Sequence, residues 1–137
     1  GQRLGGGDIG YRIPAEINDE YYHHRGALAA ARDNNPEKAS SGCQFYIVTG
    51  KKFTDAELDN FSQRSGRTLT AEQRAVYKTE GGALHLDGNY TVFGKVTKGM
   101  DVAEKIANAP RDGADRPQTD IRMKSVRIIK KKRFLFF

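Results

Sequence analysis

The stretch from residue 26 to residue 50 constrains the fold of this chain more than any other part. It opens with small apolar residues (27–31), continues through a polar loop that contains Pro36, and ends in an aromatic and β-branched run (43–48). Side chains of the last kind favour strands, and the alanines are too few and too uniform in size to make a good helix. The stretch therefore predicts two extended segments joined by a loop.

One amide, Gln44, lies inside the second of these segments, beside Phe45 and Tyr46. An amide that is buried without hydrogen-bond partners destabilises a fold by about 1–3 kcal/mol, so this side chain needs either water or a specific partner. Two interpretations stay open from the pattern alone. Gln44 either faces water from an edge strand or serves a binding site.

Two capping boxes follow, each formed by a threonine and a Glu or Gln three positions later. The box that begins at Thr54 predicts a helix from 55 to 61 or slightly beyond, and the box that begins at Thr70 predicts a helix that ends near residue 78. We interpret the segment 53–79 as a helical insertion between two strands, with a structural role and no chemistry of its own.

The remaining periodicity predicts strands and one further helix. Apolar residues recur with the spacing of one helix face between residues 102 and 107, which predicts a helix over 100–107. The other segments predicted as extended are 11–17, 90–96 and 121–129. Strands and loops with a few short helices favour a β-barrel or sandwich over a layered α/β fold.

Net charge and hydropathy limit the classes of partner that we expect for this chain. The chain has 137 residues, enough for one domain with a core, and a net charge of +6. Four of its 23 Lys and Arg residues lie together at 130–133, which leaves 19 against 17 Asp and Glu. The basicity thus belongs to a tail and not to a face, and we expect no nucleic-acid partner. No apolar run is long enough to cross a bilayer, so we expect no membrane partner.

Metal binding is disfavoured by the spacing of the possible ligands. His23 and His24 are neighbours, and neighbouring side chains of an extended segment point to opposite sides, which makes them poor joint ligands for a metal ion. We expect neither a metal nor a cofactor. The single cysteine, Cys43, excludes an internal disulfide and says little about the cellular compartment.

Several runs together, in this order along the chain, resemble the cyclophilin family of peptidyl-prolyl cis-trans isomerases: GALAAA at 26–31, GCQFYI at 42–47, LDGNYTVFGKV at 86–96 and GMDV at 99–102. The resemblance extends from about residue 5 to 129. It implies a mainly β fold, a closed antiparallel eight-stranded barrel with capping helices. The chain is then a single incomplete domain, 1–137, that covers the C-terminal two-thirds of the family pattern. The segment 53–79 is similar to insertions in some bacterial members.

The resemblance also implies which side chains line the active groove. Gln44 would hold the substrate backbone through its amide. Tyr46, where the family usually has Phe, would form the floor of the proline pocket, with Leu86 as a wall and Tyr90 completing it. The implied activity is the peptidyl-prolyl cis-trans isomerisation of X–Pro bonds, which assists protein folding. The implied partners are proline-containing polypeptides.

Further residues are implied at the margin of the groove. Ala31 and Arg32 would line the neighbouring wall and pair with the substrate backbone, and Asp33 follows in the same loop. His85 stands where some members carry the Trp that contacts cyclosporin, so we expect weak cyclosporin binding. The compartment stays open between the bacterial cytoplasm and the periplasm.

The residue types fit this chemistry. Rotation about a peptide bond faces a barrier of ~18–20 kcal/mol, while X–Pro bonds leave cis and trans close in energy, so a catalyst has only to favour the twisted state. An apolar socket and a few hydrogen-bonding groups can do this by binding the transition state. This favours the binding-site interpretation of Gln44. A non-catalytic module that grips proline-containing segments is the alternative.

One departure from the family concerns its catalytic arginine. The family's FHR and QGGD motifs have no counterpart here, and Arg3 is not a credible substitute. We therefore expect this chain alone to be impaired as an enzyme. The first strands, the first helix and the arginine of the family are then cut away, left out, or carried by another chain.

Overall fold

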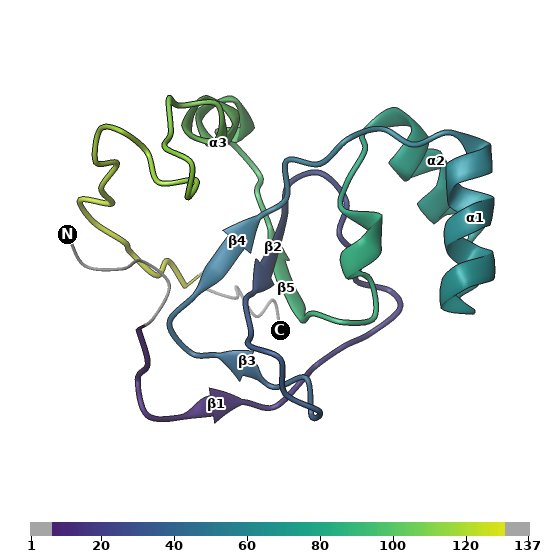
Figure 1. Cartoon of the computed structure of the whole chain (residues 1–137), viewed down its shortest axis with the longest axis horizontal. Helices are drawn as coiled ribbons and strands as arrows, with labels where there is room; N and C mark the ends of the chain where they lie inside the picture. Colours follow the sequence, from purple (N-terminus) through teal and green to yellow (C-terminus); the bar gives the residue numbers. More distant parts are fainter. Residues whose placement is uncertain (1–6, 131–137) are drawn as a thin grey trace, which may run out of the picture.

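The computed structural model describes residues 7–130. Its elements are, in chain order, β1 (Arg12–Ile13), β2 (Ala27–Ala30), β3 (Ser40–Ser41), β4 (Phe45–Ile47), α1 (Asp55–Ser65), α2 (Ala71–Thr79), the 3-10 helix η1 (Leu84–Leu86), β5 (Val92–Lys95) and α3 (Met100–Ala107). A sheet of β4, β2 and β5 lies at the centre, with α1 and α2 to its right and α3 to its upper left in Figure 1. None of the described helices has the length and apolar character needed to span a membrane.

The central sheet is antiparallel throughout, in the order β4-β2-β5. Ala29 of β2 is paired with Tyr46 of β4 on one side and with Val92 of β5 on the other. The two extended segments predicted within residues 26–50 are therefore confirmed, and they pair directly with each other. A second, smaller sheet pairs β1 with β3 in antiparallel orientation.

The two faces of the central sheet differ in burial. Side chains alternate along a strand, so Ala29 and Tyr46 lie on one face while Phe45 and Ile47 lie on the other. Ala29 is fully buried, whereas Phe45 is 53% and Ile47 36% exposed. Phe93 lies where the pairing of β5 with β2 shifts its register, and it is 57% exposed. Within residues 7–130, one face is thus covered and the other presents apolar side chains to solvent.

Both capping boxes are formed, and both predicted helices are confirmed. The Thr54 side chain accepts a hydrogen bond from the backbone of Glu57, whose carboxylate accepts one from the backbone of Thr54. Thr70 and Gln73 bond in the same reciprocal way. The first helix ends where Gly66 adopts a φ of 68°, a conformation that glycine reaches without strain.

The helical pair contributes to a buried apolar cluster of the described chain. Leu58 of α1, Leu69 of the connecting loop, Tyr77 of α2 and Leu84 of η1 are all buried in it. Three partly buried rings pack against these residues: Tyr22, Phe53 and Phe61. The core of the described chain therefore lies between the helices and the end of the central sheet, and not within a barrel.

The helix predicted over 100–107 is confirmed as α3, but the strand predicted over 121–129 is wrong. Residues 121–130 have no regular secondary structure, and Ile128 is 90% exposed. A strand needs a neighbouring backbone to bond to its N–H and C=O groups, and residues 7–130 do not provide one here. The extended segment predicted over 11–17 is a strand only at Arg12–Ile13, and the one predicted over 90–96 is a strand at Val92–Lys95.

The fold class agrees with the prediction at the level of a sheet with a few helices. The predicted closed barrel is not formed by residues 7–130, because β4 and β5 are the edges of an open three-stranded sheet. The basic run at 130–133 lies outside the described residues, apart from Lys130.

Candidate functional site

The best-defined contact among the predicted site residues joins the rings of Tyr46 and Tyr90. Tyr46 comes from β4 and Tyr90 from the segment that leads into β5, with β2 between these two strands. The ring centres are 6.1 Å apart and the ring planes meet at 82°, the edge-to-face geometry that aromatic pairs favour. Ala29 lies opposite Tyr46 on β2, and its small side chain leaves room for the two rings to meet.

Arg32 lies beside the second ring. Its guanidinium carbon is 4.9 Å from the centre of the Tyr90 ring, a cation–π distance. Its Nε donates to the carbonyl of Asn89 at 2.8 Å, and a terminal nitrogen donates to the carbonyl of Asp33 at 2.8 Å. These bonds hold the planar cation in place, so Tyr46, Tyr90 and Arg32 form one cluster, which we call the aromatic corner.

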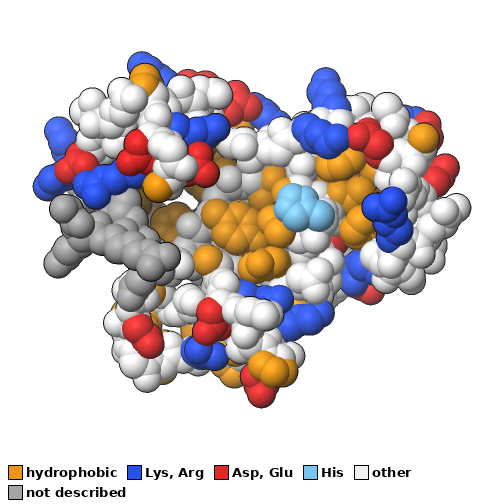
Figure 2. All heavy atoms as spheres, viewed as in Figure 1, with side chains coloured by type: hydrophobic (Ala, Val, Ile, Leu, Met, Phe, Trp, Pro, Cys, Tyr) orange, Lys and Arg blue, Asp and Glu red, His pale blue; other side chains and the backbone are white. Residues whose placement is uncertain are grey.

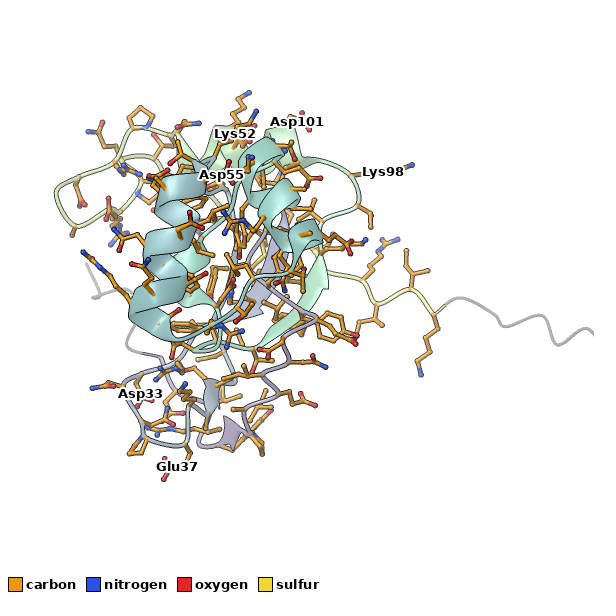
Figure 3. All side chains as sticks on the ribbon, turned by 90° about the vertical axis from the view of Figure 1, so that its right-hand side faces the viewer. Asp33, Glu37, Lys52, Asp55, Lys98 and Asp101 are labelled. Atoms are coloured by element: carbon orange, nitrogen blue, oxygen red, sulfur yellow. The ribbon has the colours of Figure 1, made fainter. Side chains whose placement is uncertain are left out.

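The Asp33 side chain is engaged elsewhere. Its carboxylate accepts hydrogen bonds from Arg12 at 2.5 Å and from Asn35 at 2.7 Å. Figure 3 shows Asp33 in the loop at the lower end of the molecule, far from Asp55 of α1. The side chain thus ties this loop to β1, and only the Asp33 backbone contacts the aromatic corner.

Gln44 and Ala31 meet through their backbones, since the Ala31 N–H donates to the Gln44 carbonyl at 3.0 Å. Gln44 also lines a hollow of about 340 Å³ together with Phe45 and Phe93. The aromatic rings of the corner do not line this hollow. Gln44 is half-buried, and its side-chain amide is not among the buried polar groups of residues 7–130 that lack a hydrogen-bond partner. The structure therefore places Gln44 next to the aromatic corner without bonding it there.

Leu86 and His85 belong to η1, just before Tyr90 in the chain. Leu86 is half-buried and its carbonyl accepts a hydrogen bond from the Asn89 N–H at 3.1 Å, whereas His85 is exposed. Figure 2 shows hydrophobic side chains gathered at the centre of the face seen in Figure 1, beside a histidine and with Lys and Arg near the margin. An apolar surface bordered by cations is thus accessible over the middle of the molecule.

A buried polar chain, which sequence reasoning missed, runs behind the aromatic corner. The Tyr46 hydroxyl lies 3.0 Å from His23 Nε2, and His23 Nδ1 lies 2.8 Å from Asp87 Oδ1. The Tyr77 hydroxyl donates to Asp87 Oδ2 at 2.6 Å. His23, Asp87 and Tyr77 are 1%, 4% and 0% exposed. A signal was present in the sequence: Asp87 directly follows an apolar turn of chain, and an aspartate buried there needs hydrogen-bond partners.

Burial determines the pKa shifts of Tyr46 and Tyr77, the two tyrosines in this chain of hydrogen bonds. It is the main cause that raises the pKa of Tyr46, with smaller contributions from Tyr90 and Asp87. Burial also raises the pKa of Tyr77, followed by the effect of the Asp87 carboxylate. Both phenols therefore keep their protons at neutral pH and remain available as hydrogen-bond donors.

This arrangement suits the binding of a ring more than the transfer of a proton to a substrate. Two aromatic rings at a right angle offer an apolar surface, and Arg32 places a fixed cation at its edge. The polar end of Tyr46 is turned into the protein, toward His23. The aromatic corner thus combines apolar ring surface with one fixed cation.

Comparisons with known proteins agree on one family. The model of the family described as "Cyclophilin type peptidyl-prolyl cis-trans isomerase/CLD" matches residues 1–128. A protein of Streptococcus pyogenes whose name combines a phosphatase with a peptidyl-prolyl cis-trans isomerase is 31% identical over 93% of this chain and 26% of its own length. A protein of Staphylococcus saprophyticus named as a peptidyl-prolyl cis-trans isomerase is 30% identical over 92% of this chain and 61% of its own length.

A third relative, a peptidyl-prolyl cis-trans isomerase of Acinetobacter baylyi, is 37% identical over 72% of this chain and 37% of its own length. The chain thus spans less than two thirds of each of these three relatives. The family model nevertheless covers nearly the whole chain, and the predicted resemblance is confirmed. The chain belongs to the cyclophilin-type peptidyl-prolyl cis-trans isomerase family.

Proposed function

We propose that the protein to which this chain belongs isomerises X–Pro peptide bonds in polypeptides and so assists their folding. Family membership supports the proposed reaction. The geometry of the aromatic corner supports its assignment as the site of that reaction. The observation that carries the proposal is the right-angled meeting of Tyr46 and Tyr90 over the small residues of β2, with Arg32 beside them. Such a corner fits the ring of a proline residue.

The mechanism needs no nucleophile. The peptide bond resists rotation by ~18–20 kcal/mol because the twisted amide loses its resonance, and a site that binds the twisted form better than the planar forms lowers this barrier. In our proposal Tyr46 is the floor of the proline pocket, Leu86 a wall and Tyr90 its closing side. The amide of Gln44 and the guanidinium of Arg32 hold the backbone of the bound polypeptide.

The remaining predicted residues act at the margin in this proposal. Ala31 lines the wall next to Arg32, Asp33 fixes the loop that carries them, and His85 lies at the outer rim. We propose that an exposed His85, in place of a large aromatic ring, makes cyclosporin binding weak. The alternative function, a module that binds proline-containing segments without isomerising them, differs in one observable, the rate of exchange between cis and trans.

We also propose a domain organisation for the whole protein. The apolar side chains on the open face of the sheet, Phe45, Ile47 and Phe93, are covered by further strands that close a barrel of the family type. Residues 1–137 then belong to a single cyclophilin-like domain, in which 53–79 is a helical insertion. The sequence has no counterpart of the family's arginine motif, so residues 1–137 alone do not accelerate the reaction.

The function is tested by exchange NMR on a short proline-containing peptide with the full-length protein. We expect exchange between the cis and trans signals in the presence of the protein, and a loss of about tenfold or more for Tyr46→Ala. Tyr11→Ala, which removes an exposed ring that takes no part in the ring contacts of Tyr46 and Tyr90 among the described residues, serves as the control and keeps the rate. Shifted signals without exchange would favour the binding module, and full activity of residues 1–137 alone would contradict the proposed role of an arginine outside them.

A further inference from the structure

The floor of the proposed pocket is supported from inside the protein by a chain of hydrogen bonds that ends on α2. From Tyr46 the chain passes to His23, then to Asp87, then to Tyr77. His23 also donates its backbone N–H to Asp87 Oδ1 at 2.9 Å, so two bonds fix the carboxylate against His23. The last member, Tyr77, belongs to the segment that the sequence predicts to be a structural insertion without chemistry.

The direction of these bonds follows from the donor and acceptor inventory. An ionised carboxylate only accepts, so Tyr77 O–H and His23 Nδ1–H both donate to Asp87. The hydrogen bond to Asp87 occupies Nδ1, so Nε2 is the ring nitrogen that bonds the Tyr46 hydroxyl. Each oxygen of Asp87 has its own donor, and each ring nitrogen of His23 its own partner. Each of these polar side-chain atoms thus has a hydrogen-bond partner, and buried networks of this kind favour a single arrangement of their side chains.

Packing holds the far end of this chain. Tyr77 is fully buried among Leu58, Leu69 and Leu84, and its ring is 5.6 Å from Phe53 and 5.5 Å from Tyr22. The near end is less constrained, because Tyr46 lies at the surface of the aromatic corner and is only half-buried. A change at Tyr77 can therefore reach Tyr46 through connected hydrogen bonds, by way of Asp87 and His23.

We propose that Tyr77, Asp87 and His23 are positioning residues that fix the ring of Tyr46, so that the helical pair α1–α2 supports the proline pocket. The proposal rests on the proposed function for its effect on catalysis, and on the hydrogen bonds for its effect on the ring. Holding the Tyr46 hydroxyl inward turns an apolar ring face toward the substrate. The pocket keeps the geometry that binding of a twisted prolyl bond requires, since small displacements of positioning groups change rates strongly.

A double-mutant cycle on the full-length protein tests this coupling. Tyr77→Phe keeps the buried ring and removes only the donor to Asp87, and Tyr46→Phe keeps the pocket ring and removes the other end of the chain. We expect Tyr77→Phe to lower kcat/KM for a proline peptide about three- to tenfold, and to have no further effect in the Tyr46→Phe background, because residues of one network are not additive. Equal effects of Tyr77→Phe in both backgrounds would overturn the proposal.

The matched control is Tyr22→Phe. Its ring packs against Tyr77 as well, but in residues 7–130 its hydroxyl takes part in no hydrogen bond. We expect Tyr22→Phe to leave kcat/KM unchanged while Tyr77→Phe lowers it. A similar loss in both variants would mean that the packing of the helical pair, and not the hydrogen-bonded chain, is what matters, and would also overturn the proposal.

A spectroscopic measurement separates this inference from the proposed function. With ring-labelled tyrosine and no substrate, the Tyr46 signals should shift and its ring should flip faster in Tyr77→Phe, but not in Tyr22→Phe. If the full-length protein does not isomerise the peptide, the function fails, yet the ring signals still decide the positioning. Tyr46 signals that are the same in the wild type and in Tyr77→Phe refute the positioning whatever the activity.

Discussion

Two apolar regions of this chain differ in how far they are buried. The cluster between the helices and the sheet, built on Leu58, Tyr77 and Leu84, is buried almost completely. The face of the sheet that carries Phe45 and Phe93 is more than half exposed at both rings. Both regions are rich in large apolar side chains, so composition does not distinguish them.

The difference lies in where the covering residues come from. The helical cluster is covered by segments close to one another in the chain, all but one of its residues lying within 53–84. The open sheet face is not covered by any segment of residues 7–130. A region whose contacts are local in sequence closes by itself, whereas a face of a sheet depends on pairing with distant segments.

The largest loss of stability should follow from truncating a side chain in the buried helical cluster. Leu58 is 0% exposed, so Leu58→Ala should lower the free energy of unfolding by about 2–5 kcal/mol through lost burial and the cavity left behind. Urea denaturation followed by circular dichroism measures this. The volume-conserving Leu58→Met is the control and should cost less than about 1.5 kcal/mol. Equal costs for the two variants would contradict the tight packing described for this cluster.

A smaller effect should follow from removing one helix cap. Thr54 accepts the hydrogen bond of the Glu57 N–H, and Thr54→Ala should lower the free energy of unfolding by about 1 kcal/mol because that donor loses its partner. Thermal unfolding of the wild type and the variant measures the difference. Thr54→Ser keeps the hydroxyl and should stay near the wild type, and a loss as large as that of Thr54→Ala would argue against capping as the cause.

The smallest effect should come from the open face. Phe45 is 53% exposed, so in the 137-residue chain Phe45→Ala should change the free energy of unfolding by less than about 1 kcal/mol, since half of the ring stays in water in the folded state. The same urea titration measures it. A cost as large as that of Leu58→Ala would show that this face is covered in solution, and the contrast between the two regions would disappear.

Local signals predicted the elements well. The two capping boxes located both helices of the pair, because a cap is decided by residues three positions apart. The apolar spacing located α3, and the aromatic and β-branched runs located β4 and β5. The prediction failed at 121–129, where a pattern typical of a strand has no neighbour to pair with among residues 7–130. The closed barrel that the resemblance implies is not formed by residues 7–130 either, since β4 and β5 have no further strand beside them there.

The candidate site was predictable in part. The resemblance named Tyr46, Tyr90 and Arg32, and the structure brings these side chains together. It also named Asp33, whose carboxylate is bonded elsewhere. The sequence gives no sign of the role of His23, because nothing in a linear pattern indicates that it lies against Asp87, a residue 64 positions away.

The sequence by itself determined the helices, their caps, the strand runs and the family, since each of these depends on residues near one another in the chain or on motifs read in order. Only the tertiary structure decided which face of the sheet is buried and which residues lie behind the aromatic corner. The physical reason is that burial and hydrogen-bond partnership of a side chain are set by whatever segment packs against it. Tyr46, His23, Asp87 and Tyr77 come from four separate segments, and only folding makes them neighbours.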